Sequence, residues 1–205
     1  MLLRACVAVF VIAASSAQAE CPTGADIAGK ALQLSGMGET KTYRLEADGI
    51  VHLTSEYSDI PTWEAQYLYG IYPITYTDPY PVGATGVLGS VSHFTRSVPQ
   101  GALPLPEPGK SIEMDRQEWI TYEGSEGMPG TTLYLTFTFG IPTTITIADC
   151  SYQDAVPVIM DPGESAYAKQ GSYFVPSLGF AITFEDPGPD DLPTFRFVKT
   201  IKVVP

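Results

Sequence analysis

The stretch Thr-Thr-Leu-Tyr-Leu-Thr-Phe-Thr-Phe, residues 131–139, is the most strongly patterned segment of the chain. Large apolar side chains occupy every second position from 133 to 139, and threonine or tyrosine fills the positions between them. Successive side chains of a strand point to opposite faces of a sheet, so this pattern places one face against a core and the other in water. The stretch therefore predicts a half-buried antiparallel strand.

A second clear signal is the hairpin over residues 42–57. Strand-forming residues 42–46 and 50–53 flank Ala47, Asp48 and Gly49, and the Asp-Gly pair is typical of a type I′ turn. Further strands are expected at 63–69, 71–76, 87–98, 111–123, 143–148, 155–160, 172–175, 179–185 and 194–204. Pro73 indicates that the strand containing it is an edge strand or carries a bulge.

These patterns predict an all-β fold, a mostly antiparallel β-sandwich or barrel-like sheet. The chain has 18 Pro and 19 Gly, which favour turns over long helices. An internal duplication is one interpretation, because Tyr69-Gly70-Ile71 recurs as Phe139-Gly140-Ile141. We expect one domain over residues 20–205. The alternative is two sub-units, 20–98 and 110–205, joined by the Pro-rich segment 99–109.

The first nineteen residues have the pattern of a secretory signal peptide. Arg4 supplies the positive charge, residues 5–14 are apolar, and Ala17-Gln18-Ala19 is a small-x-small cleavage site. We therefore expect cleavage after Ala19 and a periplasmic or secreted protein. The apolar run is too short for a transmembrane segment, and no later run approaches the length that a membrane span needs.

The chain is strongly acidic. Its formal net charge is −12, and loss of Arg4 with the signal peptide would change this to −13. Phosphate backbones repel such a chain, so nucleic acid is a poor candidate partner. The densest acidic run, 185–191, lacks the spacing of a calcium loop and is interpreted as a solvated loop.

Two cysteines, Cys21 and Cys150, remain after cleavage, and only one pairing is available to them. In an oxidising compartment this count predicts a structural disulfide. Two buried free thiols or a metal pair are the alternatives, and no third metal ligand stands near either cysteine in the sequence.

Motifs that carry catalysis are not recognisable. The two histidines, His52 and His93, are too few for a zinc set of familiar spacing, and His52 has the pattern of an ordinary strand residue. The chain lacks the nucleophile elbow and the Gly-rich phosphate loops. We therefore assign no catalytic residue, cofactor or metal ligand, although a carboxylate pair of the glycosidase kind stays open among the many acidic residues.

Aromatic side chains are concentrated between residues 57 and 80. Tyrosine and tryptophan form adaptable binding faces, and they also fill the cores of β-proteins. Both interpretations stay open at this point. The candidates for a ligand or partner surface are Trp63, Tyr67, Tyr69, Tyr72 and Tyr76.

Three segments of the C-terminal half form a recurring pattern: residues 147–152, which contain Cys150 and Tyr152, residues 156–159, and residues 173–180, which contain Tyr173, Pro176 and Leu178-Gly179. On these segments the chain resembles a family of uncharacterised exported (periplasmic) proteins of Gram-negative bacteria. The last element is also similar to envelope proteins with lipoprotein-carrier-like sheets, which present a curved apolar face to acyl chains. The family carries no assigned activity, so the resemblance implies an exported β-protein and no catalytic residue.

Three functions are therefore considered. The first is an envelope protein that binds or scaffolds an unknown protein through its sheet surface, without catalysis. The second is a periplasmic carrier of an apolar or lipid-like small molecule, held by the aromatic candidates. The third is a carboxylate-based hydrolase. A carrier requires a continuous apolar cavity, a scaffold a filled core with an exposed edge or patch, and a hydrolase two facing carboxylates.

Overall fold

The fold was analysed in a computed structural model. It describes residues 21–58, 62–78, 90–96, 102–122, 127–163, 168–183 and 192–205. The predicted signal peptide, the predicted loop beyond residue 78 and the acidic run 185–191 lie outside these residues.

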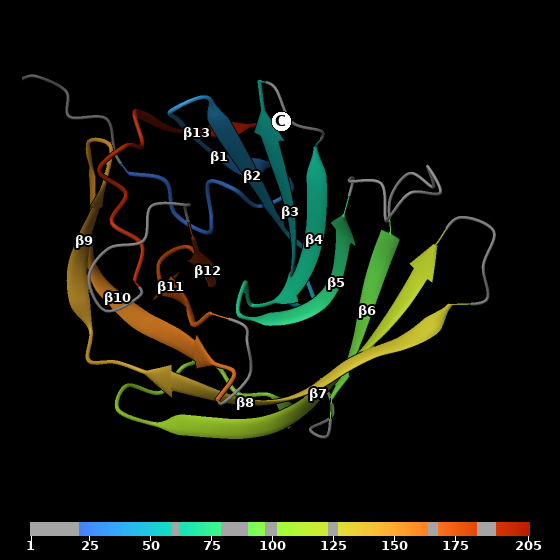
Figure 1. Cartoon of the computed structure of the whole chain (residues 1–205). Helices are drawn as coiled ribbons and strands as arrows, with labels where there is room; N and C mark the ends of the chain where they lie inside the picture. The colour runs from blue at the N-terminus through green and yellow to red at the C-terminus, as the bar shows by residue number, and fades with distance from the viewer. Residues whose placement is uncertain are drawn as a thin grey trace, which may run out of the picture.

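The described chain is all-β: a single antiparallel sheet of thirteen strands that is not closed into a barrel, with no helix in the described ranges (Figure 1). The strands are β1 (Ala31–Gly36), β2 (Glu39–Leu45), β3 (Ile50–Tyr57), β4 (Trp63–Leu68), β5 (Tyr72–Asp78), β6 (Ser90–Arg96), β7 (Ser111–Tyr122), β8 (Met128–Phe139), β9 (Thr143–Ile147), β10 (Cys150–Asp161), β11 (Gln170–Val175), β12 (Phe180–Ile182) and β13 (Thr200–Val204). The all-β, antiparallel prediction is confirmed.

Strand order follows the chain almost throughout. Neighbours run β12-β11-β10-β8-β7-β6-β5-β4-β3-β2-β1-β13, and β9 pairs with β10 beside this path. Strands β1 to β8 form a meander of hairpins, and β13 returns from the end of the chain to pair with β1. The sheet runs unbroken from β6 to β7 across the Pro-rich connection, so both predicted sub-units contribute to one sheet.

The segments with the strongest sequence patterns form the strands that these patterns predict. In β8 the alternate side chains from Leu133 to Phe139 are buried, whereas Tyr134 is 74% exposed. The β2–β3 hairpin also forms, but its turn is not type I′. The Gly49 amide donates to the Glu46 carbonyl, and of the three turn residues only Gly49 has a positive φ, 85°. This is a type I turn followed by a glycine with left-handed backbone angles, the usual form of a three-residue hairpin loop.

The bulge that Pro73 predicts is present in its own strand, β5: Gln66 pairs with Thr75 and Tyr67 with Pro73, so Ile74 is the extra residue. Strand β5 is an interior strand, and its pairing with β6 covers only residues 75–78. Another expectation changes in detail. The predicted strand 194–204 is wrong in its first half: Phe195 has φ 55° and accepts a turn hydrogen bond from Val198, so the strand begins at Thr200. Strand β1 was not predicted.

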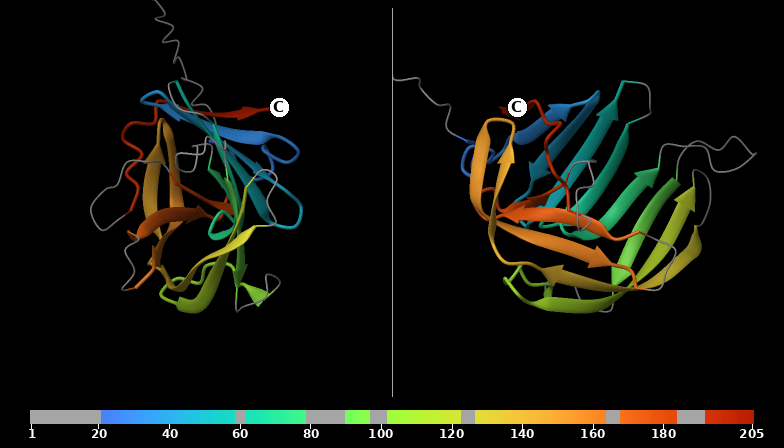
Figure 2. Two further views of the ribbon diagram at one scale, coloured as in Figure 1. Left: turned by 45° about the vertical axis from the view of Figure 1, so that its right-hand side comes forward. Right: turned by 60° about the vertical axis from the view of Figure 1, so that its left-hand side comes forward.

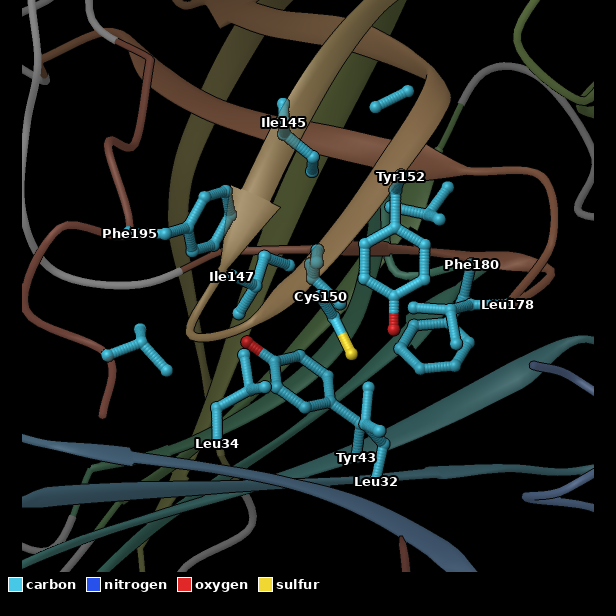
Figure 3. Close-up of a cluster of buried hydrophobic side chains, with 14 of the residues drawn as sticks. Leu32, Leu34, Tyr43, Ile145, Ile147, Cys150, Tyr152, Leu178, Phe180 and Phe195 are labelled. Atoms are coloured by element: carbon cyan, nitrogen blue, oxygen red, sulfur yellow. The ribbon is translucent and has the colours of Figure 1, made fainter. Parts of the chain in front are cut away.

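The sheet curls until its two ends face each other (Figures 1 and 2). Side chains from β1, β2 and β3 meet those from β9, β10 and β12 in one core, where Leu32, Tyr43 and Phe180 are almost fully buried (Figure 3). A second core lies between β5, β7, β8 and β10 and contains Tyr72 and Phe137. A single curled sheet thus buries apolar side chains as two stacked sheets would.

Strand β12 is held inside the curl by contacts across its outer edge, which we call the β12 seam. The Tyr43 hydroxyl donates to the Thr183 carbonyl and accepts from the Thr183 amide, 3.2 Å away. The Ala181 amide donates to the Tyr69 carbonyl over 2.8 Å. Gly70, with φ 71°, fits beside this bond because a Cβ there would overlap the Ala181 carbonyl oxygen.

The structural environments of the two halves of the proposed duplication differ. Tyr69-Gly70-Ile71 forms the β4–β5 turn, whereas Phe139-Gly140-Ile141 lies where β8 ends and the chain leaves toward β9. The duplication and the domain boundaries stay predictions. Within the described residues, no helix has the length and apolar character to cross a bilayer.

Replacing Tyr43 with phenylalanine tests the β12 seam. The Tyr43→Phe protein keeps the ring in the core but leaves the part-buried amide and carbonyl of Thr183 without this partner. We expect the free energy of unfolding to fall by about 1–3 kcal/mol in chemical denaturation. The matched change Tyr134→Phe, on an exposed ring, should alter it by less than about 0.5 kcal/mol. If both variants change the free energy of unfolding by equally negligible amounts, the stabilising role of the β12 seam is contradicted.

Candidate functional site

The five aromatic candidates do not form one surface. Tyr72 is completely buried, meets Phe137 edge-on with ring centroids 5.1 Å apart, and donates its hydroxyl to the Pro104 carbonyl. Burial raises the pKa of Tyr72 above its usual value. For this residue the core interpretation is therefore correct.

Trp63, Tyr67 and Tyr76 lie on the concave side of β4 and β5. The rings of Trp63 and Tyr76 are 5.7 Å apart, and Lys41 Nζ stands 5.6 Å from the Trp63 ring. Trp63 and Tyr67 pack against the first core, and burial raises the pKa of Tyr67 to about 12. These three side chains are partly buried and act mainly as packing. The last candidate, Tyr69, is different because it borders an open groove.

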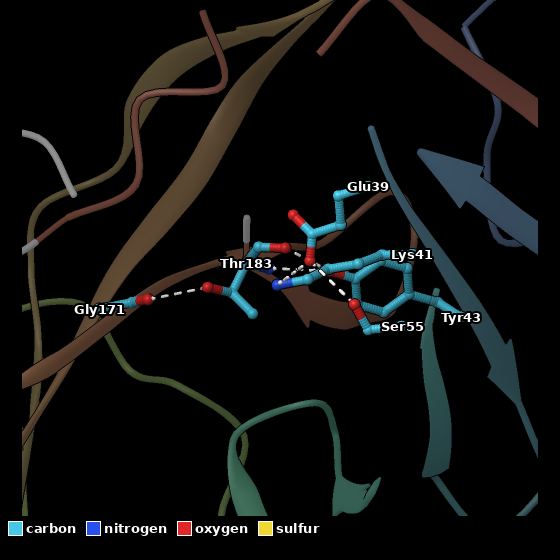
Figure 4. A network of polar contacts seen from close by, with 6 residues as sticks. All are labelled: Glu39, Lys41, Tyr43, Ser55, Gly171 and Thr183. Carbon is cyan, nitrogen blue, oxygen red and sulfur yellow. Dashed lines mark hydrogen bonds and ion pairs between the residues drawn. The ribbon is translucent and has the colours of Figure 1, made fainter. Parts of the chain in front are cut away.

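A buried network of charged and polar groups lies on the same concave side (Figure 4). Lys41 Nζ and Glu39 Oε1 are 3.4 Å apart, with side-chain exposures of 2% and 4%, and the Ser55 hydroxyl donates to Glu39 over 2.9 Å. Glu39, Lys41 and Tyr43 alternate along β2 and so share a face. The network therefore lies directly beside the β12 seam.

The geometry of this network favours a structural role. Both charges are almost inaccessible, so a ligand would have to displace packed side chains to reach them. A buried ion pair contributes little net stability, but loss of one partner leaves an uncompensated charge. We did not anticipate the pair from the sequence. The available signal was the placing of two charges at the core-facing positions of β2.

Cys21 and Cys150 are brought together, although no disulfide joins them. Both are free thiols, and their side chains are in hydrogen-bonding contact. The predicted disulfide is therefore not formed in the structure, because the two sulfurs are not at bonding distance. Burial and then the contact with Cys21 raise the pKa of Cys150 to about 12. A thiol with so high a pKa is a poor nucleophile at neutral pH.

A small depression of about 200 Å³ lies beside the thiol pair. Cys21, Pro22 and Tyr152 line it, together with residues from the β11–β12 turn, and the Tyr152 hydroxyl donates to the Pro22 carbonyl over 3.2 Å. This contact and the bond from the Gly24 amide to the Ser177 carbonyl fix the segment that begins at Cys21. The depression thus marks where this segment packs on the sheet.

A larger groove of about 450 Å³ lies where three turns meet, and we call it the seam groove. The β2–β3 turn forms one rim, Tyr69 of the β4–β5 turn borders the groove, and Leu105 also lines it. The lining residues are Leu45, Glu46, Ala47, Asp48, Gly49, Tyr69, Leu105, Phe174, Pro176 and Gly179. Leu105 is 50% exposed, so the groove presents apolar surface to solvent.

The polar groups of the seam groove come from one turn. Glu46 Oε1 is 3.0 Å from His52 Nε2, and Asp48 Oδ1 accepts the Ile50 amide over 3.1 Å. The two carboxylates stand on the same rim rather than across the groove. A glycosidase-type pair instead requires carboxyl groups on both sides of the scissile bond.

The histidines lie apart from each other. His52 is on β3, and His93 is exposed on β6 with Nε2 3.4 Å from the Thr121 hydroxyl. Among the described residues, no group of three or more His, Cys, Asp or Glu is placed to hold a metal ion.

The comparisons add no relative. Neither the protein-family models, the curated proteins nor the solved structures contain a match to this chain. The resemblance of the C-terminal half to exported Gram-negative proteins therefore stays a prediction.

The buried ion pair can be tested by removing one or both charges. In Lys41→Met, Glu39 stays buried without its cation, so we expect the free energy of unfolding to fall by about 3–5 kcal/mol. The double change Lys41→Met with Glu39→Leu should cost less than the single change. Chemical denaturation of the three proteins measures this, and a double variant less stable than Lys41→Met would contradict the proposed pairing.

Proposed function

We propose that this is an exported, non-catalytic binding protein, and that the seam groove is its binding site. The groove carries the proposal: its volume of about 450 Å³ lies within the range of ligand pockets, and its border combines apolar side chains with a few polar groups at one side. It is also formed by turns held on a rigid sheet, where binding residues are often found.

The packing of the cores favours surface binding over the carrier alternative. A carrier of the kind considered above needs the aromatic candidates around one continuous cavity. Tyr72 instead fills the second core, and Trp63 and Tyr67 pack on the first. Of the five, Tyr69 alone lines the seam groove.

The chemistry of the accessible groups favours binding over hydrolysis. The carboxylates of the groove share one rim, and the Cys150 thiol is kept protonated by burial. The seam groove therefore supplies no facing carboxylates, and Cys150 is not an activated thiol. Residues 1–19 support export, since they have the pattern of a cleaved signal peptide.

In the same proposal, Cys21 and Cys150 form a disulfide after export. The two thiols are neighbours in the structure, since Cys21 packs against the core that contains Cys150 and acts on its pKa. Exchange with an oxidised envelope dithiol protein joins the two sulfurs, and that protein takes up the two electrons and two protons. The closed loop spans about 130 residues and would stabilise the fold by at most about 5 kcal/mol on the chain-entropy model.

The bridge predicts a mass and a pH effect. Protein from the periplasm should be lighter by two hydrogen atoms than its reduced form, and Cys21→Ser should show no such difference.

In the reduced protein the Cys150 thiol ionises near pH 9 when the chain is unfolded but near pH 12 when it is folded. Unfolded chains then bind fewer protons, so stability falls as the pH rises through this window.

The bridged protein lacks this thiol titration, and it also lacks the part of the raised pKa of Tyr152 that comes, after burial, from the two thiols. Both differences destabilise the reduced protein more as the pH rises. The stability difference between bridged and reduced protein should therefore grow from pH 9 to 12, as measured by denaturation. Periplasmic protein with two alkylatable thiols would contradict the bridge.

Binding of a neutral apolar probe tests the seam groove. We expect Nile red to bind the protein and Leu105→Ser to weaken this binding about fivefold, which corresponds to about 1 kcal/mol of lost apolar contact. Ile141→Ser removes a side chain that is 72% exposed elsewhere, and it should leave the affinity unchanged. Fluorescence titration measures all three proteins, and equal affinities would contradict the groove as the site.

A further inference from the structure

The charge of the seam groove has one sign. Glu46 and Asp48 are the charged residues among its ten lining residues, and both are exposed. Each carboxylate can accept several hydrogen bonds, and its contact with His52 or with the Ile50 amide uses one oxygen. Other lining residues, among them Leu105, Phe174 and Pro176, are apolar.

This arrangement suits a cation on an apolar stem. Lysine and arginine side chains pack their methylene groups along apolar surface while the charged end reaches polar groups. Leu105 offers the apolar surface, and the Tyr69 ring can also hold a cation over its face. The net charge of −12 attracts cations to the molecule as a whole.

We propose that the seam groove binds a basic peptide segment, with a lysine or arginine side chain that lies over Leu105 and Tyr69 and reaches Glu46 and Asp48. This inference rests on the proposed function and names the partner class of the same site. A peptide fits better than a small free cation because the groove is wide and open. Small-molecule sites enclose most of their ligand, whereas a peptide gains further contacts along the surface on either side.

A charge-matched set of peptides tests this. The probes are fluorescently labelled acetyl-Leu-Lys-Leu-Lys-amide and its Gln and Glu counterparts, with butylamine as a competitor that represents a small cation. The variants are Glu46→Gln with Asp48→Asn in the groove and, as the control, Glu56→Gln with Glu64→Gln, which removes two exposed charges outside the groove lining. Fluorescence anisotropy gives the affinities.

We expect the Lys peptide to bind the natural protein more tightly than the Gln peptide and the Glu peptide to bind weakest. The groove variant should lose about two- to thirtyfold in affinity for the Lys peptide, the range for two exposed ion pairs, and the control variant should lose clearly less. Raised salt should reduce the preference for the Lys peptide.

The basic-peptide inference would be overturned if the three peptides bind equally and Leu105→Ser weakens all three. The groove would then remain a binding site without a preference for basic peptides. Equal loss in both charge variants would overturn the inference too, since it would show only general attraction. If butylamine at equal concentration displaces the Lys peptide, the inferred ligand is a small cation and the basic-peptide inference is overturned. If neither the peptides nor Nile red bind, the proposed function fails with it.

Discussion

The position of β12 inside the curl is the constraint on which the rest of the structure depends. An open sheet has no closing hydrogen bonds to fix its curvature, so another contact must bring its ends together. Here the Tyr43 hydroxyl donates a hydrogen bond to the carbonyl of Thr183 and accepts one from its amide, 140 residues along the chain. The Tyr69 carbonyl accepts a hydrogen bond from the Ala181 amide of β12. These bonds satisfy a buried strand edge, and they hold Phe180 and Ile182 in the first core.

Several other features follow from this contact. The buried Lys41–Glu39 pair lies on the same face of β2 as Tyr43, so the curl that buries Tyr43 also removes these charges from water. The seam groove lies where the β2–β3, β4–β5 and β11–β12 turns converge, and they converge because β12 docks beside them. The proposed binding site is thus a consequence of how the sheet closes on itself, rather than of any single strand.

The sequence predicts the local part of this fold and not the long-range part. Alternation fixes β8 and the β2–β3 hairpin because the period of a strand is visible over a few residues. The curl is not visible, since Tyr43 and Thr183 are far apart in the chain and neither belongs to a motif. The aromatic candidates illustrate the limit: which of Tyr69 and Tyr72 faces a groove or a core depends on the partner strands. Alternation around Phe195 predicts a strand there, although its backbone is left-handed in a turn.

The account therefore depends on β12 being firmly held in solution, and residue-resolved amide hydrogen exchange measures this most directly. If the β12 seam holds the curl, the Ala181 and Thr183 amides should exchange as slowly as those in the β2–β3 ladder, because opening them requires the first core to separate. Fast exchange of both amides while the β2–β3 ladder stays protected would show that β12 is only loosely attached. The curl, the buried pair and the groove would then lack their common support.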